Sequence, residues 1–212
     1  MDLDKKVIVI TGGSEGLGKS LAKAFKEANA NVIICAKNNK KLLTVAKEIN
    51  AIPFIADVTK ENDIKSLANF AIKKFGTIDI WINNAGITQP YDSIENINLK
   101  RGHQIMETNL FGTIYGSRVA FSIMKPKKKG VIINIISVHA FAGRPQSSIY
   151  TASKWAVRGF TKSLALASKP EKILIMAVYP AGMKTKLFGS KNDRKGYKKF
   201  MEPSSVANKI IK

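Results

Sequence analysis

The stretch Thr11-Gly-Gly-Ser-Glu-Gly-Leu-Gly18 decides the fold that we expect for this chain. It follows a short apolar run, Lys5–Ile10, and opens an amphipathic stretch, Leu17–Ala28. Glycines between a strand and a helix permit a tight turn and a close approach to a pyrophosphate, which the free N–H groups of the helix N-terminus can bind. The spacing is not the usual G-x-G-x-x-G, so the turn alone could be purely structural. Its place between a strand and a helix favours a dinucleotide site.

The rest of the chain repeats this alternation of apolar runs and amphipathic stretches. Nearly continuous hydrophobicity, mostly from Val and Ile, predicts strands that are covered on both faces, as in parallel sheets. The runs after the first are Asn31–Ala36, Ala51–Ala56, Ile78–Ile82, Val131–Ile136 and Lys172–Val178. The further amphipathic stretches, which predict helices, are Lys40–Ile49, Glu61–Phe75, Gly102–Met124, Ser148–Ser168 and Pro203–Ile211. We therefore expect an α/β fold in which residues 1–212 form a single domain, a Rossmann-type doubly wound parallel sheet with helices on both faces.

The composition agrees with one globular domain and narrows the choice of partners. The chain has 212 residues, of which 45% are hydrophobic, and this is enough for a sizeable core. Lys and Arg total 35 against 15 acids, which gives a formal net charge of +20. The basic residues are spread along the chain, with knots at Lys127–Lys129 and Lys191–Lys199, and no zinc-finger, homeodomain or RNP pattern accompanies them. We expect a solvated basic surface and no specific nucleic-acid partner.

Cysteine usage and the N-terminus indicate the compartment. Cys35 is the only cysteine, so the chain can form neither an intramolecular disulfide nor a thiolate metal cluster, and no His/Asp/Glu cluster has metal-ligand spacing. Residues Met1–Lys6 lack the basic-then-apolar build of a signal peptide. No apolar run approaches the ~20 residues that span a bilayer. We expect a cytoplasmic protein with no bound metal and no membrane span.

The end of the second predicted strand bears on the choice of dinucleotide. An NAD site has an acid there that accepts a hydrogen bond from the ribose 2′-OH. After Glu27 no acid occurs until Glu48, and the turn instead carries Lys37, a cation suited to a 2′-phosphate. We therefore favour NADP(H) over NAD(H), although Lys37 could be a solvated lysine. At the ends of the next two strands, Asp57-Val58 and Asn83–Gly86 could meet an adenine or could hold neighbouring strands by hydrogen bonds.

A second set of residues suggests the chemistry. Tyr150 and Lys154 lie four apart at the start of a predicted helix, so both side chains share one face. A nearby ammonium lowers a tyrosine pKa from ~10 toward neutrality, where the phenol becomes a usable general acid or base. The pair alone could be a helix-surface pair. Ser137, at the end of the strand Val131–Ile136, could hold a reacting oxygen, and Asn109, in mid-helix, could bind a water or be a polar face residue.

Together these residues resemble the short-chain dehydrogenase/reductase family. The matching motifs occur in the family's order and spacing and span essentially the whole chain: Thr11–Gly18, Asn83-Asn-Ala-Gly86, Asn109, Ser137, Tyr150-Thr-Ala-Ser-Lys154 and Pro180-Ala-Gly-Met-Lys-Thr185. The resemblance implies that Tyr150 donates or accepts the proton, and that Lys154 lowers its pKa and binds the nicotinamide ribose. It implies that Ser137 orients the substrate oxygen and that Asn109 holds a water in the proton relay.

Strand-end position and resemblance together define a set of cofactor-binding residues. The set is Gly12, Ser14, Glu15, Gly16, Leu17, Gly18, Lys37, Asp57, Val58, Asn84, Ala85, Gly86, Tyr150, Lys154, Pro180, Gly182 and Thr185. Three features depart from the family pattern. Ala181 replaces a usual glycine, and Glu15 stands where many NADP-dependent members carry a base. The chain ends at Lys212, whereas members usually continue into one more strand, so we expect a naturally short or a truncated C-terminus.

These observations predict an NADP(H)-dependent oxidoreductase that transfers hydride between the nicotinamide and a carbonyl or alcohol carbon. The substrate would be a small ketone or aldehyde, or a 3-oxoacyl thioester on an acidic carrier, and the resemblance implies that residues 185–202 select it. His139 could line the pocket, whereas His103 is less suited to do so. The alternative is a regulatory protein of this fold that senses NADP(H) without turnover, although a sensor needs no proton donor. Because the helices Gly102–Met124 and Ser148–Ser168 pair subunits in the family, we expect a homodimer, with a homotetramer left open.

Overall fold

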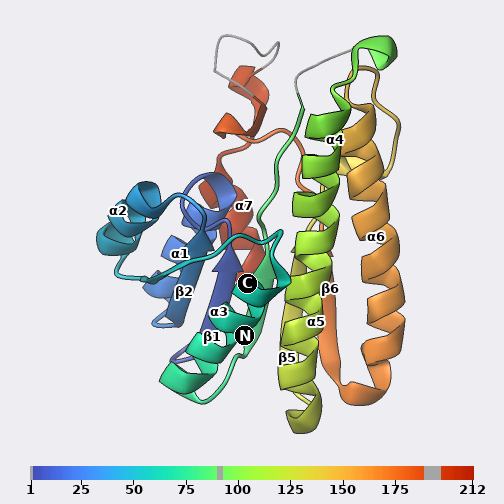
Figure 1. Cartoon of the computed structure of the whole chain (residues 1–212). Coiled ribbons are helices and arrows are strands. Elements are labelled where there is room, and N and C mark those ends of the chain that lie inside the picture. The colour runs from blue at the N-terminus through green and yellow to red at the C-terminus, as the bar shows by residue number, and fades with distance from the viewer. Residues whose placement is uncertain (1, 90–92, 189–196) are drawn as a thin grey trace.

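A six-stranded parallel sheet forms the centre of the molecule (Figure 1). The computed structural model describes residues 2–89, 93–188 and 197–212. The strands follow the order β3-β2-β1-β4-β5-β6. Their bounds are β1 Val7–Thr11, β2 Asn31–Ala36, β3 Ile52–Ile55, β4 Ile80–Asn83, β5 Gly130–Ile135 and β6 Ile173–Val178. The α-helices are α1 Gly16–Glu27, α2 Asn39–Ile49, α3 Glu61–Phe75, α4 Leu99–Met106, α5 Gly112–Met124, α6 Ser148–Ser168 and α7 Pro203–Ile210. The predicted doubly wound sheet is therefore confirmed.

The strand order reverses between β1 and β4, and this reversal positions the site. The two strands lie side by side in parallel, with Ile8 opposite Ile80 and Ile10 opposite Ile82. Their carboxyl ends therefore meet at one edge, where the crossovers leave in opposite directions and open a crevice. The glycine turn follows β1 at this edge and the segment Asn84–Gly86 follows β4.

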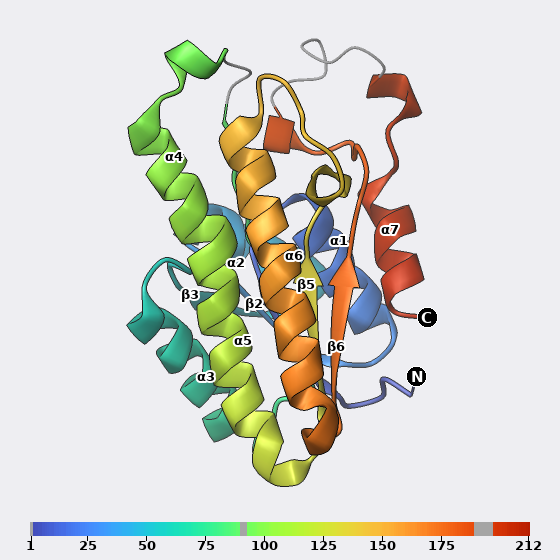
Figure 2. The same cartoon turned by 90° about the vertical axis from the view of Figure 1, so that its right-hand side faces the viewer.

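Two helical layers cover the sheet, and each has its own apolar core. Helices α1, α2 and α7 pack on one face, where Leu21 and Phe25 of α1 meet Ile8 and Ile34 of the strands. Helices α3 and α5 pack on the other face against strand residues such as Trp81, which is completely buried. Figure 2 shows α6 beside α5 in this second layer, with β6 behind it. The outer sides of α5 and α6 face the viewer and no described element covers them.

The two edge strands differ from the expectation that every strand is covered on both faces. Ile55 in β3 is 56% exposed and Leu174 in β6 is 51% exposed. Both strands have a neighbour on one side only within the described residues. Apolar composition alone does not distinguish an edge strand from a central one, because the difference depends on strand order.

The long helix expected over Gly102–Met124 is also corrected. It begins earlier, as α4 at Leu99, and is interrupted by a π-helical turn, Glu107–Phe111, before it continues as α5. Asn109 therefore lies in a π turn and not in a regular α-helix. Such single turns insert one residue into the helical ladder and often occur at functional sites.

Among the described residues, no helix is both long and apolar enough to cross a membrane.

Candidate active site

The turn after β1 requires glycine at three of its positions. Gly12 and Gly16 adopt positive φ values of 65° and 54°, which residues with a side chain rarely adopt. A Cβ on Gly18 would lie 2.2 Å from the carbonyl oxygen of Gly12, so helix α1 could not pack this closely on the turn. No described side chain caps the N-terminus of α1, whose N-cap residue is Glu15. The turn therefore presents unpaired helix N–H groups at the crevice, which fits a dinucleotide pyrophosphate.

Asn84 and Thr11 hold this turn against the end of β4. The Asn84 amide donates to the carbonyl oxygens of Thr11 at 2.9 Å and Gly12 at 3.1 Å. The Thr11 hydroxyl accepts from the backbone N–H groups of Asn84 at 3.0 Å and Ala85 at 3.1 Å. The next strand end, at Asn84–Gly86, is thereby fixed beside the glycines. The sequence left two roles open for Asn84, an adenine contact or a hydrogen bond between neighbouring strand ends. These bonds show the second role.

Two ion pairs lie where the adenosine half of a dinucleotide would bind. Lys37, after β2, pairs with Asp57, after β3, at 3.0 Å, and Lys41 pairs with Glu15 at 3.2 Å. Burial alone would raise the pKa of Asp57, but hydrogen bonds from Thr59 and Lys37, with the charge of Lys37, hold it below its usual value. Lys37 remains 69% exposed at its side chain. Each acid at this end is thus neutralised by a lysine.

Tyr150, Lys154 and Ser137 come together at the carboxyl end of β5. Tyr150 and Lys154, on the first turns of α6, are 3% and 6% exposed, and the Lys154 ammonium lies 5.6 Å from the centre of the Tyr150 ring. Ser137 lies two residues after the end of β5 and is also buried. Its hydroxyl oxygen accepts from the backbone N–H of His139 at 3.2 Å, which leaves the hydroxyl proton for another acceptor.

Lys154 is a cation in an apolar setting. Burial lowers its pKa from 10.5 to about 8, and its ammonium donates to the carbonyl oxygen of Ile135 at 3.2 Å. A Cβ added to Gly86 would lie 3.7 Å from this ammonium, so the segment after β4 borders the same space. The ammonium is therefore placed between the phenol and the carboxyl ends of β4 and β5.

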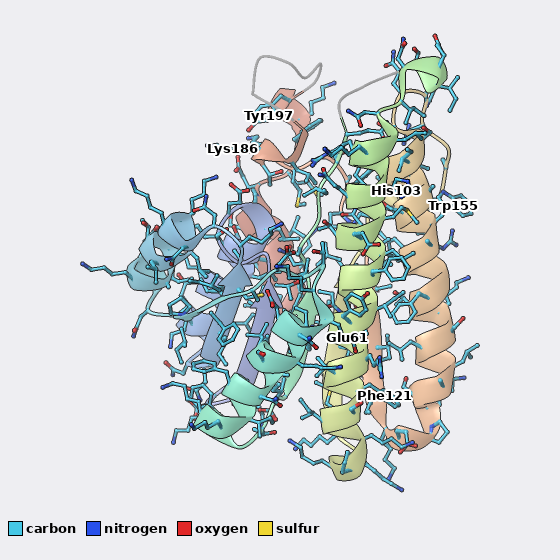
Figure 3. The ribbon with its side chains drawn as sticks, in the orientation of Figure 1. Glu61, His103, Phe121, Trp155, Lys186 and Tyr197 are labelled. Carbon is cyan, nitrogen blue, oxygen red and sulfur yellow. The ribbon has the colours of Figure 1, made fainter. Side chains whose placement is uncertain are left out.

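His139 lies closer to the reaction end than its sequence position alone indicated. Its ring packs edge-on against Tyr150, with ring centres 5.2 Å apart. Burial, and then the charges of Arg144 and Lys154, lower the pKa of His139 below its usual value, so the ring is mainly neutral at neutral pH. His103, by contrast, is an exposed residue of α4 (Figure 3).

Asn109 is positioned by the π turn and bonds in three directions. Its side-chain oxygen accepts from the backbone N–H of Ile87 at 2.9 Å, and its amide donates to the Ile87 carbonyl at 3.0 Å. The same amide donates to the Ser153 hydroxyl at 3.0 Å. Asn109 thus joins the segment after β4 to helix α6 one residue before Lys154.

The segment after β6 closes the crevice from the other side. The Pro180 carbonyl accepts from the backbone N–H of Val138 at 3.1 Å, which ties this segment to the residue after Ser137. A Cβ on Gly16 would lie 3.2 Å from the Thr185 side chain, so Thr185 lies against the glycine turn. A Cβ on Gly182 would overlap the Phe200 ring at 2.8 Å. Residues 189–196 of the expected specificity segment lie outside the described residues.

Two residues near Tyr150 were not predicted from the sequence. Gln89, which is 7% exposed, accepts with its side-chain oxygen from the backbone N–H of Tyr150 at 3.1 Å. Arg101 donates to the carbonyl oxygen of Thr88 at 3.0 Å and 2.7 Å. Neither residue belongs to a motif, and no periodicity marks them.

Among the described residues, no group of three or more His, Cys, Asp or Glu could hold a metal ion.

Comparisons with known proteins agree with this geometry. The family model described as short chain dehydrogenase matches residues 6–196. The chain belongs to the short-chain dehydrogenase/reductase family. L-fucose dehydrogenase of Bos taurus is 34% identical over 184 residues, which are 86% of this chain and 68% of that protein. L-fucose dehydrogenase of Mus musculus is 34% identical over the same share of this chain and 67% of its own length.

Solved structures place the whole chain in the same family. The 3-ketoacyl-(acyl-carrier-protein) reductase of Brucella melitensis, complexed with NADH, superposes with a TM-score of 0.91 at 29% identity, over 99% of this chain and 90% of that one. A short-chain type dehydrogenase/reductase of Mycobacterium marinum gives a TM-score of 0.92 at 28% identity, over 99% and 88%. This chain is therefore an NAD(P)-dependent oxidoreductase that acts on CH–OH or C=O groups.

Proposed function

We propose that this short-chain dehydrogenase/reductase uses NADP(H) to interconvert a carbonyl compound and its alcohol, with Tyr150 as the proton donor and acceptor. The observation that carries the proposal is the placement of the Lys154 ammonium 5.6 Å from the Tyr150 ring, with both residues buried at the end of β5. A nearby positive charge favours the phenolate, which is what a phenol needs to exchange protons near neutral pH. When bound, the nicotinamide supplies or accepts the hydride.

The chain's own groups would handle the substrate oxygen and its proton. In the reductive direction the Tyr150 hydroxyl donates its proton to that oxygen, and in the oxidative direction the phenolate accepts it. The Ser137 hydroxyl donates a second hydrogen bond to the same oxygen, since its own acceptor site is used by the backbone of His139. Lys154 stabilises the phenolate and reaches the nicotinamide ribose. Asn109 would hold the relay water through the Ile87 carbonyl with which it is already paired.

The cofactor residues fall into three groups in this proposal. The pyrophosphate would lie on the glycine turn and the α1 N-terminus, with Gly12, Ser14, Glu15, Gly16, Leu17 and Gly18. Asp57, Val58, Ala85 and Gly86 would border the adenine and ribose, and Pro180, Gly182 and Thr185 the nicotinamide. Preference for NADP(H) is supported by Lys37 beside the β2 end and by Lys41, whose ion pair neutralises Glu15.

The proposed substrates are still a small ketone or aldehyde and a carrier-bound 3-oxoacyl thioester, and the name of the relatives adds a sugar as a third class. The relatives named L-fucose dehydrogenase and the ketoacyl reductase structure make both classes reasonable for a first screen. The net charge of +20 would favour an acidic carrier. We also propose that residues 1–212 act as one catalytic domain. The cytoplasmic localisation of the protein stays a prediction from the sequence.

A dimer through α5 and α6 completes the proposal. Trp155 and Leu166, eleven residues apart and hence on one side of α6, are 47% and 66% exposed, and Figure 3 shows Trp155 on the outer side of the helix. Gly159 lies between them, and a Cβ added there would meet no described atom within 4 Å. A second copy could therefore approach this stripe closely.

The test is a screen in both directions over carbonyl and alcohol compounds, with NADPH, NADH and their oxidised forms followed by absorbance. The panel includes L-fucose, small ketones and aldehydes, and a 3-oxoacyl thioester with and without its acidic carrier. Turnover of any member, faster with the 2′-phosphorylated cofactor, is the expected result. Tight binding of NADPH without turnover on the whole panel would contradict the proposal and favour a sensor of NADP(H).

A further inference from the structure

Gln89 links the catalytic tyrosine to a distant part of the chain. It lies in the segment Ile87–Gln89 that follows β4, and its side chain is 7% exposed. Its side-chain oxygen accepts a hydrogen bond of 3.1 Å from the backbone N–H of Tyr150, across 61 positions of sequence. The bonded group belongs to the residue that carries the reacting phenol.

The bond meets a need that helix α6 does not meet by itself. The helix begins at Ser148, so Tyr150 lies in its first turn, where backbone N–H groups have no partner within the helix. Its N-cap residue, Ser147, makes no capping bond with a described group through its side chain. Since Tyr150 is 3% exposed, bulk water cannot readily take the place of a protein acceptor. Gln89 therefore acts as a helix cap supplied from outside the helix.

The segment that carries Gln89 is itself fixed on two sides. Asn109, in the π turn, bonds both the N–H and the carbonyl oxygen of Ile87. The guanidinium of Arg101, on α4, donates two hydrogen bonds to the carbonyl oxygen of Thr88. Three consecutive residues are thus tied to α4, to the π turn and to α6. The start of α6 takes its position from this segment.

We propose that Gln89 is a positioning residue for Tyr150, which acts through the backbone of the catalytic helix. The proposal rests on the proposed role of Tyr150 as proton donor. Proton transfer needs the donor within a few tenths of an ångström of its productive position, and a displacement of 1 Å can cost up to about a hundredfold in rate. Without the cap, the first turn of α6 frays and the phenol loses its fixed position.

The test compares two substitutions of equal length. Gln89→Met keeps the shape but removes the oxygen acceptor, and Gln89→Glu keeps an oxygen at the same distance, next to a helix N-terminus that favours negative charge. We expect Gln89→Met to lower kcat about tenfold at saturating substrate, with the Kd for NADPH unchanged within about twofold. Gln89→Glu should keep kcat within about threefold of the parent enzyme. When kcat is expressed per folded molecule, a loss of stability alone would leave it unchanged in both variants.

Phe25→Leu provides the matched control for stability. Phe25 is 1% exposed at the far end of α1, away from the reaction end, so this variant loses stability and should keep its kcat. Full kcat in Gln89→Met would overturn the proposal, and so would an equal loss in Gln89→Met and Gln89→Glu. Amide hydrogen exchange at Tyr150 separates this failure from that of the proposed function. It should speed up in Gln89→Met and not in Gln89→Glu, whichever carbonyl compounds the parent enzyme reduces.

Discussion

The Lys154 ammonium lies 5.6 Å from the centre of the Tyr150 ring, and both side chains are almost wholly buried. In the proposed mechanism this arrangement would stabilise a phenolate, but it leaves a cation in an apolar setting, where the ammonium donates to the Ile135 carbonyl oxygen at 3.2 Å. Burial lowers the pKa of Lys154 from 10.5 to about 8. The buried charge that the proposed mechanism needs therefore lowers the stability of the cofactor-free protein.

Lys154→Met should stabilise the cofactor-free protein at pH 7. In the folded state the lysine pKa lies below its unfolded value, so the destabilising effect of the buried charge is present in full below pH 8. It is lost as the pH rises from about 8 to 10.5, where the unfolded chain binds the proton and the folded chain does not. A shift of this size corresponds to about 3 kcal/mol in the free energy of unfolding.

The measurement is urea unfolding of both proteins at pH 7 and pH 9.5. The variant should be more stable at pH 7, and the difference should shrink at pH 9.5. Lys162→Met, which removes an exposed lysine from the same helix, serves as the control and should change little at either pH. If Lys154→Met is no more stable than the parent protein at pH 7, the buried charge of Lys154 does not destabilise the folded protein.

The cofactor preference is tested at Lys37. With this lysine paired to Asp57 at the rim of the β2 end, NADPH should bind at least about tenfold more tightly than NADH, a difference of ~1.4 kcal/mol. Lys37→Asp should narrow or invert the difference, because it repels a 2′-phosphate and offers an acceptor to a 2′-OH. Fluorescence titrations with both cofactors measure it. Lys23→Asp, an equal charge change on the exposed side of α1, should leave the ratio alone, and equal affinities in the parent protein would refute the assignment.

Assembly is tested at Gly159. Gly159→Arg should give a monomer at micromolar concentration, since a long cation at the centre of the α6 stripe blocks a close approach by a second copy. The fold should survive, because no described atom lies within 4 Å of a Cβ at this position. Gly159→Ala should keep the dimer and raise the free energy of unfolding by about 0.5–1 kcal/mol, because alanine favours a helix more than glycine does. Light scattering measures the oligomeric state of the parent protein and of both variants. A parent protein that is only monomeric would contradict the proposed interface.

The sequence predicted the fold where periodicity carries the information. The bounds of α3, α6 and β2 agree with the expected ranges, because each is a clear run of one period. The π turn at Glu107–Phe111 was missed, since one inserted residue hardly disturbs a helical pattern. The exposed edge strands were missed as well, because strand order determines which runs lie at an edge.

The residues of the candidate site also divide into those that the sequence predicted and those that it did not. Ser137, Tyr150 and Lys154 were predictable because a motif with fixed spacing holds them, and the structure brings them together. Gln89 was not predictable, because its partner is the backbone N–H of a residue 61 positions away. Almost every residue has a backbone N–H, so no sequence pattern marks this partner. The ion pair between Lys37 and Asp57 was not predictable either. It forms because β2 and β3 are neighbours in the sheet, and the sequence alone does not give the strand order.

The most direct test of the account is the kcat of Tyr150→Phe, measured beside the Kd for NADPH with a substrate found in the screen. The change removes only the hydroxyl, so the fold and the cofactor affinity should persist, while loss of a general acid should lower kcat by roughly 10²–10⁴, or about 3–5 kcal/mol of barrier. Tyr115→Phe, which removes a hydroxyl from α5, should behave as the parent enzyme. If Tyr150→Phe keeps more than about a tenth of the parent kcat, Tyr150 is not the proton donor and the proposed mechanism is wrong.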